Sequence, residues 1–510
     1  MVAASPDADI VVTLGLWAPD WWHAKNPGQI TAHMDANLKV VESNGSQVSF
    51  GSTLWRDQCV ELIQRTFAHM REQKYYAKIA GVRIAAGGTA ENIIFDSQSD
   101  EFTPDYSAAA LEYFRNWAKE TYKTIENLRI VWNDPTIESF ETIEFPDYNE
   151  LRVDAGTNGL YDPKTQQKLI DFRKLAGYMT SDCLNTWAKA IKEATDYKLI
   201  VGCYYGYLWA GPSYGVATQE ISSIYGSPYL DFFFAPAGYN ERQLGEGEYS
   251  EAVSDSARAY GKLFITEQDN RTCLSMAYAG TKWNTTRDFS VGVTHTFNDS
   301  ILQQKRDAAY NICNGNGQWH YDMLGGWFND DQLLEMTNDF NDEFNYLNYV
   351  ERDVINEMAL IIPDSNVEYS RWALTQDGDY AKAAGAVRMQ YVYKWQRKEL
   401  DKAGAGYDVY GLSTMVDGLV PEHKIYVFLN PYVLTKPELE AIERNCKQNG
   451  KICIFLMEAG YGYNTDDLEE KLAELQSENC KIGYSEQNMK DFTGFDIKVE
   501  MLTPRQGEAG

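Results

Sequence analysis

The chain has 510 residues, 44% of them hydrophobic and 13% aromatic, so it is too long for one typical core and too apolar to be disordered. Its 74 acidic and 46 basic residues give a net charge of -28, which repels a phosphate backbone or an anionic membrane surface. We therefore expect a multidomain globular protein whose partners include neither nucleic acid nor a membrane.

The first part of the chain alternates short β-branched runs with long amphipathic stretches. This pattern is typical of a parallel sheet whose strands are joined by crossover helices. The predicted strands are residues 10–16, 79–85, 199–205, 230–236, 263–267 and 318–323. The predicted helices are residues 53–71, 107–122, 163–194 and 302–314. Six such strands predict an α/β fold of the TIM type, a (β/α)-barrel that has eight strands when closed.

The strand and helix pattern restarts near Asp353. Its predicted strands are residues 357–363, 424–430 and 451–456, and its predicted helices are residues 381–403 and 436–449. This alternation predicts a smaller, flavodoxin-like α/β domain over residues 354–510, after a barrel domain over residues 1–353. The glycine-containing residues 404–411 and 460–462 lack the Lys-Ser/Thr pair of a phosphate loop, so we interpret them as tight turns.

Two glutamates lie at predicted strand ends, where the catalytic groups of a barrel gather. Glu91 follows the strand at residues 79–85 through a flexible, glycine-containing turn, and Glu267 closes the apolar run LFITE. A carboxylate that ends an apolar strand is costly unless it is solvated or paired. A catalytic function explains this placement, and an ion pair with Arg83 or Arg271 is the alternative.

Hydrolysis of a glycosidic bond needs a pair of carboxyl groups of this kind. One protonates the leaving oxygen, and the other attacks the anomeric carbon or activates water. Retention requires the two groups to be about 5 Å apart, a separation that the sequence leaves open.

Further polar and aromatic residues follow the predicted strands and are candidates for binding substrate. They are Trp17, Asp20, Trp21, Trp22, Asn92, Tyr204, Tyr205, Tyr207, Trp209, Tyr239, Arg242, Asp269, Arg271, Asp322 and Trp327. The tryptophans around Asp20 predict either a sugar-stacking shelf or a hydrophobic plug. Asp269 and Arg271 could tune the charge of Glu267 or pair with each other.

Several motifs resemble those of family 42 β-galactosidases and related clan A glycoside hydrolases. Residues 105–146 resemble the segment after the fourth barrel strand, with a Ser-initiated helix carrying FRNW and then YKTIENL leading to a Trp. WAPDWW resembles the end of the third strand, GGTAEN the fourth, ITEQDNRT the seventh and QWHYDMLGGW the eighth. The part after Asp353 is similar to the small α/β domain that follows the barrel in these enzymes.

The resemblance implies that Glu91 is the general acid/base and Glu267 the nucleophile of a retaining β-glycosidase. It also implies a glycoside or oligosaccharide substrate. Clan A enzymes usually carry Asn directly before the acid/base, where it contacts the sugar 2-hydroxyl. Here Ala90 precedes Glu91 and Asn92 follows it, so the match to the clan is closer than the match to the family.

Measured against the family pattern, the chain lacks the first two barrel strands. An open sheet exposes edges and one side of the core, so we expect a homo-oligomer in which another subunit covers the open side. A non-catalytic carbohydrate-binding protein derived from such an enzyme is the alternative function. A cytoplasmic location is favoured if Met1 is the true start.

No cofactor is expected. The eight cysteines are scattered, with no CxxC pair and no Cys/His cluster at the spacing of zinc ligands.

Overall fold

The computed structural model describes most of the chain. The described residues are 8–34, 38–42, 47–94, 105–151, 160–208, 217–239, 242–247, 249–278, 292–322, 325–347, 356–369, 396–446, 450–456, 460, 462–463 and 468–476. Among these residues, no helix is both long enough and apolar enough to cross a membrane.

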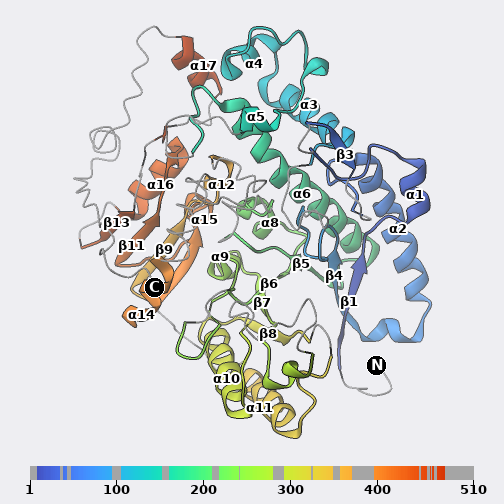
Figure 1. Ribbon diagram of the computed structural model, residues 1–510, viewed down its shortest axis with the longest axis vertical. Helices are drawn as coiled ribbons and strands as arrows, with labels where there is room; N and C mark the ends of the chain where they lie inside the picture. Colours follow the sequence, from blue (N-terminus) through green and yellow to red (C-terminus); the bar gives the residue numbers. More distant parts are fainter. Residues whose placement is uncertain are drawn as a thin grey trace.

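Six parallel strands form one curved sheet in which neighbours follow chain order (Figure 1). They are β1 Ile10–Gly15, β4 Ile79–Ala85, β5 Ile200–Tyr204, β6 Phe232–Pro236, β7 Leu263–Gln268 and β8 Gly317–His320. Within the described residues β1 and β8 are not paired, so the sheet is a half-barrel with two edges. The six strands and the barrel-type α/β fold predicted from the sequence are confirmed.

Helices cover the outer face of this sheet, and further short segments connect them (Figure 1). They are α1 Asp20–Lys25, α2 Thr53–Arg71, η1 Lys74–Lys78, α3 Ala108–Tyr122, α4 Ile125–Trp132, η2 Phe140–Thr142, α5 Tyr148–Leu151, α6 Gln167–Ala194, α8 Ile221–Tyr225, α9 Ser254–Ala259, η3 Cys273–Tyr278, α10 Phe297–Cys313 and α11 Asp331–Leu347. A short antiparallel hairpin, β2 Ala32–Met34 with β3 Val40–Glu42, was not predicted.

Capping and spacing explain the helix bounds. The Ser52 hydroxyl accepts a hydrogen bond from the Trp55 amide at 3.1 Å, so α2 begins at Thr53 as predicted. Its buried residues Trp55, Cys59, Ile63 and Phe67 recur every four positions, which gives the helix one core-facing stripe. By contrast, α10 begins earlier than predicted, because Thr296 caps it through the Asp299 amide.

Strand parity decides which side chains enter the half-barrel. Residues paired across parallel strands point to the same face, so Arg83, Tyr204, Phe234 and Ile265 lie on the inner face with Glu267. Alternate residues such as Val82, Ile84, Val201, Cys203 and Phe233 are fully buried on the outer face under the helices. The inner face therefore carries Arg83, Tyr204 and Glu267 among apolar side chains, and the outer face forms the hydrophobic core.

A second parallel sheet has the order β10-β9-β11-β13. Counted from β9, this is the 2-1-3-4 order of flavodoxin-like folds, as predicted. The strands of this part are β9 Met358–Ile362, β10 Tyr407–Gly411, β11 Ile425–Leu429, β12 Val433–Leu434, β13 Ile452–Leu456 and β14 Gly462–Tyr463. The helices are α12 Asn366–Tyr369, α14 Gln396–Ala403, α15 Leu412–Val416, α16 Lys436–Cys446 and α17 Leu468–Gln476.

The interpretation of residues 404–411 as tight turns is wrong, because five of them form β10. Tyr407 to Gly411 pair in register with Met358 to Ile362, and Tyr410 is buried. The alternation of buried and half-buried residues in YDVYG is that of a strand covered on one face. Of the predicted helix at residues 381–403, only α14 lies within the described residues.

The two sheets share a hydrophobic core. Met358, Leu360 and Ile362 of β9 pack into the cluster that also contains the outer face of the barrel sheet. Their neighbours Ala359 and Ile361 pack into a second cluster under α15 and α16. Both faces of β9 are therefore buried, one of them against the barrel unit. We propose that the chain has two units, residues 1–353 and residues 354–510, which this common core joins.

Candidate active site

Glu91 lies on an unusually shaped turn after β4. Gly87, Thr89, Ala90 and Asn92 all have left-handed φ angles of 68°, 53°, 70° and 60°. A β-branched residue such as Thr89 rarely adopts this conformation, and backbone strain of this kind clusters at functional sites. The turn brings the Glu91 side chain back over the carboxyl end of the sheet.

Asn92 holds this turn in place and is itself fully buried. Its Oδ1 accepts a hydrogen bond from the Ala86 amide at 3.0 Å, and its Nδ2 donates to the carbonyl of Tyr204 at 3.1 Å. Asn92 was predicted to bind substrate, but the structure uses both ends of its amide to join the turn to β5.

The Glu91 carboxylate receives two hydroxyl hydrogen bonds. The Tyr207 hydroxyl donates to Oε1 at 2.5 Å, and the Thr89 hydroxyl donates to Oε2. Burial raises the pKa of Glu91 above its ordinary value, and these two hydrogen bonds oppose that rise by stabilising the charged form.

Glu267 is the fifth residue of β7 and points into the half-barrel. Its side chain is buried, and the Tyr204 hydroxyl donates a hydrogen bond to Oε2. Burial, with the charge of Asp269 and then that of Glu91 adding to it, raises the pKa of Glu267 to about 8. The two glutamates therefore lie close enough to resist being charged together.

Arg83 is a cation whose charge acts on both glutamates. Its charge lowers the pKa of both glutamates, and its guanidinium lies 4.8 Å from the centre of the Tyr204 ring. The hydrogen bonds described for the two carboxylates come from the hydroxyl groups of Thr89, Tyr207 and Tyr204.

Tyr239 and its neighbours form the wall beside Glu91. The Tyr239 ring is stacked on Tyr207, with centroids 6.4 Å apart and planes 7° apart. The Arg242 guanidinium lies 4.2 Å from the centre of the Tyr239 ring, and its Nη2 is 2.6 Å from Oδ1 of Asp269. Because Arg242 is fully buried, this arrangement fixes the position of the wall.

Trp17 lies at the other side of Glu91. Its indole Nε1 donates a hydrogen bond to the carbonyl of Gly87 at 3.2 Å, and 41% of its surface is exposed. The ring lies against Gly15, since a Cβ added there would be 2.4 Å from it. The structure thus places an open aromatic face next to the turn that carries Glu91.

The last three residues of WAPDWW, Asp20, Trp21 and Trp22, lie on α1. Asp20 and Trp21 are exposed, and Trp21 lies under Lys25 at 5.3 Å. Trp22 is buried, packs edge-on against Trp55 and donates to the Gln58 side chain at 2.6 Å. The motif therefore divides into both predicted alternatives, with Trp17 open and Trp22 part of the core.

Tyr205 lies on the opposite face of β5 from Tyr204. It is 1% exposed, and its hydroxyl accepts a hydrogen bond from the Glu220 amide at 2.9 Å. Because successive residues of a strand point to opposite faces, Tyr204 points into the site and Tyr205 points away from it. Trp209, named with these tyrosines, lies outside the described residues.

The candidates after β7 and β8 form a buried support. Trp327 is 1% exposed, its ring centre is 5.6 Å from the Arg271 guanidinium, and its amide donates to Asp322 at 2.8 Å. Arg271 is buried as well. These contacts join the loops that follow β7 and β8, and a role of the three residues in binding substrate stays a prediction.

Sequence reasoning missed two aromatic residues at the end of β8. Trp319 is paired with Glu267 across the sheet, and Tyr321 follows on the same face. The pKa of the Tyr321 hydroxyl is raised by burial and then by the charges of Glu267 and Glu91, which shows that Tyr321 lies near both. Strand parity counted from Glu267 could have identified them.

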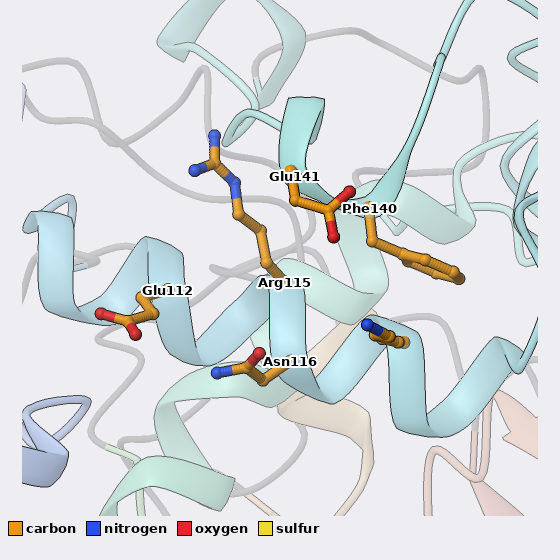
Figure 2. A pocket seen from close by; sticks show the side chains of 6 residues that line it. Glu112, Arg115, Asn116, Phe140 and Glu141 are labelled. Atoms are coloured by element: carbon orange, nitrogen blue, oxygen red, sulfur yellow. The ribbon is translucent and has the colours of Figure 1, made fainter.

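Other features of the described residues lie away from this site. No group of three or more His, Cys, Asp or Glu side chains there is arranged to hold a metal ion. A hollow of about 210 Å³ lies between α3 and η2 and is lined by Glu112, Arg115, Asn116, Lys119, Phe140 and Glu141. Figure 2 shows these side chains. None of these residues follows a barrel strand, so the hollow is separate from the glutamates.

Comparison with known proteins relates this arrangement to a family. The sequence model described as Beta-galactosidase of glycoside hydrolase family 42 matches residues 10–262. The match includes Glu91 and ends directly before β7, which carries Glu267. No curated protein matches the chain at a significant level.

Solved structures of low sequence identity share the fold. The β-galactosidase from Rahnella sp. R3 is 14% identical with a TM-score of 0.53, covering 88% of this chain and 60% of that one. The β-galactosidase from the psychrophilic Marinomonas ef1 is 12% identical with a TM-score of 0.56, covering 91% and 68%. The family 42 exo-carrageenase from Bacteroides ovatus is 12% identical with a TM-score of 0.54, covering 92% and 62%. The chain thus spans between 60% and 68% of the length of these three proteins.

The chain thus shares the (β/α)-barrel fold of these glycoside hydrolases, and residues 10–262 match the sequence model of their family. The chain is therefore similar to the family 42 β-galactosidases, and the resemblance inferred from its motifs is confirmed. The match is loose, as the departure at Ala90 and Asn92 indicated.

Proposed function

We propose that the chain is a retaining glycoside hydrolase of β-linked sugars, with Glu91 as general acid/base and Glu267 as nucleophile. The observation that carries the proposal is the pair of glutamates at two strand ends, each of which accepts a hydrogen bond from a tyrosine hydroxyl, with the charge of Glu91 adding to the raised pKa of Glu267. Such a pair favours holding a single proton near neutral pH, and a retaining enzyme starts from that state.

In the first step the proton on Glu91 passes to the glycosidic oxygen as its bond to the anomeric carbon breaks. The ionised Glu267 attacks that carbon and forms a covalent glycosyl ester. In the second step Glu91, now ionised, takes a proton from water as the water oxygen attacks the anomeric carbon. The ester bond breaks, the sugar leaves with its original configuration, and Glu267 is again a carboxylate.

We further propose that substrate lies between Trp17 and the wall of Tyr207 and Tyr239. Trp17 offers an open aromatic face on which a sugar ring can stack. Two other predicted binding residues act on the substrate indirectly. Asp269 raises the pKa of Glu267, and Arg242, paired with Asp269, holds the ring of Tyr239.

The test is hydrolysis of aryl β-galactoside, glucoside, mannoside, xyloside and fucoside by the chain, with Glu267→Ala in parallel. We expect one sugar to be cleaved and the variant to lose at least about a thousandfold in kcat. Glu91→Ala should keep the first step on a substrate with an activated leaving group. Azide should then restore turnover, because it attacks without needing a base.

Failure to cleave any glycoside, or a Glu267→Ala variant as active as the parent, would contradict the enzyme assignment. Sugar binding without cleavage, measured by the change in tryptophan fluorescence, would instead support the carbohydrate-binding alternative.

We also propose that a second copy of the chain covers the open side of the half-barrel. Val11, Ile200 and Leu263 lie on the inner face and are 48%, 41% and 46% exposed, which is high for apolar strand residues. Light scattering should give at least twice the mass of one chain, and Val11→Lys should reduce it. A monomeric mass for the parent would contradict this proposal.

A further inference from the structure

The end of β5 and the segment directly after it supply one tyrosine to each glutamate. Tyr204, the last residue of β5, donates its hydroxyl hydrogen bond to Glu267, and Tyr207, three residues later, donates to Glu91. We propose that Tyr204 and Tyr207 are positioning residues that decide which glutamate keeps the proton shared by the pair. This inference rests on the proposed function and names two further residues for it.

The first support is the way Tyr204 is fixed. Its ring is 2% exposed and stacks on Phe234 with centroids 5.2 Å apart, so the hydroxyl has one direction to point. The Asn92 amide donates to the Tyr204 carbonyl at 3.1 Å. This hydrogen bond joins the backbone of Tyr204, whose hydroxyl contacts Glu267, to the turn that carries Glu91.

Arg83 adds a charge to the same arrangement. Its guanidinium lies over the Tyr204 ring at 4.8 Å. A cation at this distance withdraws electron density from the phenol and strengthens it as a hydrogen-bond donor. Tyr204 therefore stabilises the ionised form of Glu267, which is the form that attacks the sugar.

Tyr207 is fixed by different means. Its φ angle is 66°, a left-handed value that a bulky residue adopts only when its surroundings require it. The stack on Tyr239, itself held by Arg242, supplies that requirement. Tyr207 thus belongs to the wall of the site and keeps its hydroxyl on Oε1 of Glu91.

The two tyrosines have distinguishable effects on the pH dependence of kcat/KM. A hydrogen bond donated to a carboxylate lowers its pKa, so each Tyr→Phe change raises the pKa of its own glutamate. In a retaining enzyme the acid limb reports Glu267 and the basic limb reports Glu91. Tyr204→Phe therefore moves the acid limb to higher pH and narrows the profile. Tyr207→Phe moves the basic limb to higher pH and widens it.

The first experiment measures kcat/KM against pH on the best aryl glycoside. A shift of about one pH unit in the acid limb is expected for Tyr204→Phe, which is about a tenfold loss on that side of the profile. Tyr205→Phe is the matched control, since it removes a neighbouring buried hydroxyl from the opposite face of β5. The control should lower stability and leave both limbs unchanged.

A second experiment does not depend on activity. The glutamate carboxyls are titrated by ¹³C NMR in the parent and both variants, with Glu91→Gln and Glu267→Gln assigning the two signals. We expect Tyr204→Phe to raise the titration midpoint of Glu267 and Tyr207→Phe that of Glu91. If the midpoints stay unchanged, the tyrosine proposal is overturned even when the enzyme is active. If they move in a chain that cleaves nothing, only the proposed function fails.

Discussion

At the scale of single residues, Gly15 and Trp17 make one unit. The indole lies against the bare backbone of Gly15 and is anchored by its hydrogen bond to the carbonyl of Gly87. Any side chain at position 15 would collide with the ring, since its Cβ would be 2.4 Å from the nearest ring atom. The glycine therefore decides where the aromatic face lies.

This geometry predicts the effect of two substitutions on substrate binding. Trp17→Ala removes the stacking surface, and Gly15→Ala displaces it, so both should raise KM for the best glycoside about tenfold. Trp21→Ala is the control, because its ring is 60% exposed on α1 and should change KM less than about twofold. Steady-state kinetics of the three variants check the prediction. Equal KM values for Trp17→Ala and the parent would remove Trp17 from the site.

The positions of the two glutamates could be predicted from the sequence, but the partners of these glutamates could not. Glu91 and Glu267 follow apolar runs, and the rule that barrel sites lie at strand ends needs only that pattern. Choosing between Tyr204 and Tyr205 needs the parity of β5, which a continuously apolar strand does not reveal. The core position of Trp22 depends on its contact with Trp55, which tertiary packing alone creates.

At the scale of elements, one carboxylate joins three helices. Asp171 of α6 is 3% exposed and accepts hydrogen bonds from Tyr122 at 2.5 Å, Trp132 at 2.7 Å and Gln167 at 2.7 Å. Tyr122 ends α3 and Trp132 ends α4, so these helices are fixed to the long helix behind the barrel. Helices α3 and α6 were predicted from the sequence pattern, but α4 and this joint were not, and the members of the joint are far apart in sequence.

Replacing Asp171 should therefore destabilise the fold. Asp171→Ala leaves three buried donors without their acceptor and should lower the free energy of unfolding by about 3 kcal/mol. Asp182→Ala on the same helix is the control. Its side chain is 52% exposed beside Arg56, so the loss should be about 1 kcal/mol or less. Urea unfolding followed by circular dichroism measures both, and equal losses would show that Asp171 does not join the helices.

The predicted strands were the most accurate elements, and β10 shows where the method stops. Most of the six barrel strands are short apolar runs, so hydrophobicity locates them, whereas the polar β8 (GQWH) was predicted from its place in the alternation of strands and helices. YDVYG contains Asp and Gly, which have low β propensity, and lies between short helices. The segment is a strand because its backbone pairs with β9, and this pairing cannot be predicted from the sequence of the segment alone.

At the scale of the whole molecule, the seam between the two sheets contains buried charge. Glu368 of α12 is 5% exposed and lies 3.4 Å from Lys174 of α6. Burial, with the charges of Asp364 and Asp171 adding to it against Lys174, raises the pKa of Glu368 to about 7. Glu220, at the start of α8, faces the same group. Burial and the charge of Glu368 raise its pKa to about 8.

These shifts fix the sign of the pH dependence. A carboxyl whose pKa is higher in the folded chain than in the unfolded chain stabilises the fold when it is protonated. That stability is fully present below the unfolded pKa, which is about 4.3 for glutamate. It is lost as the pH rises through the folded values near 7 for Glu368 and 8 for Glu220. The seam between the barrel and the flavodoxin-like unit should therefore weaken between pH 5 and pH 8.

We predict that the free energy of unfolding of the parent, measured by urea titration, falls over this pH range. Glu368→Gln and Glu220→Gln should each make that fall smaller by about 2 kcal/mol. Glutamine keeps the shape of the protonated carboxyl but cannot ionise, so the variants should match the parent at pH 5 and exceed it at pH 8. Glu357→Gln, exposed beside Lys424, is the control and should leave the slope unchanged. If the free energy of unfolding depends on pH in the same way for the parent and the three variants, Glu368 and Glu220 ionise without destabilising the fold. Water would then have to reach the seam.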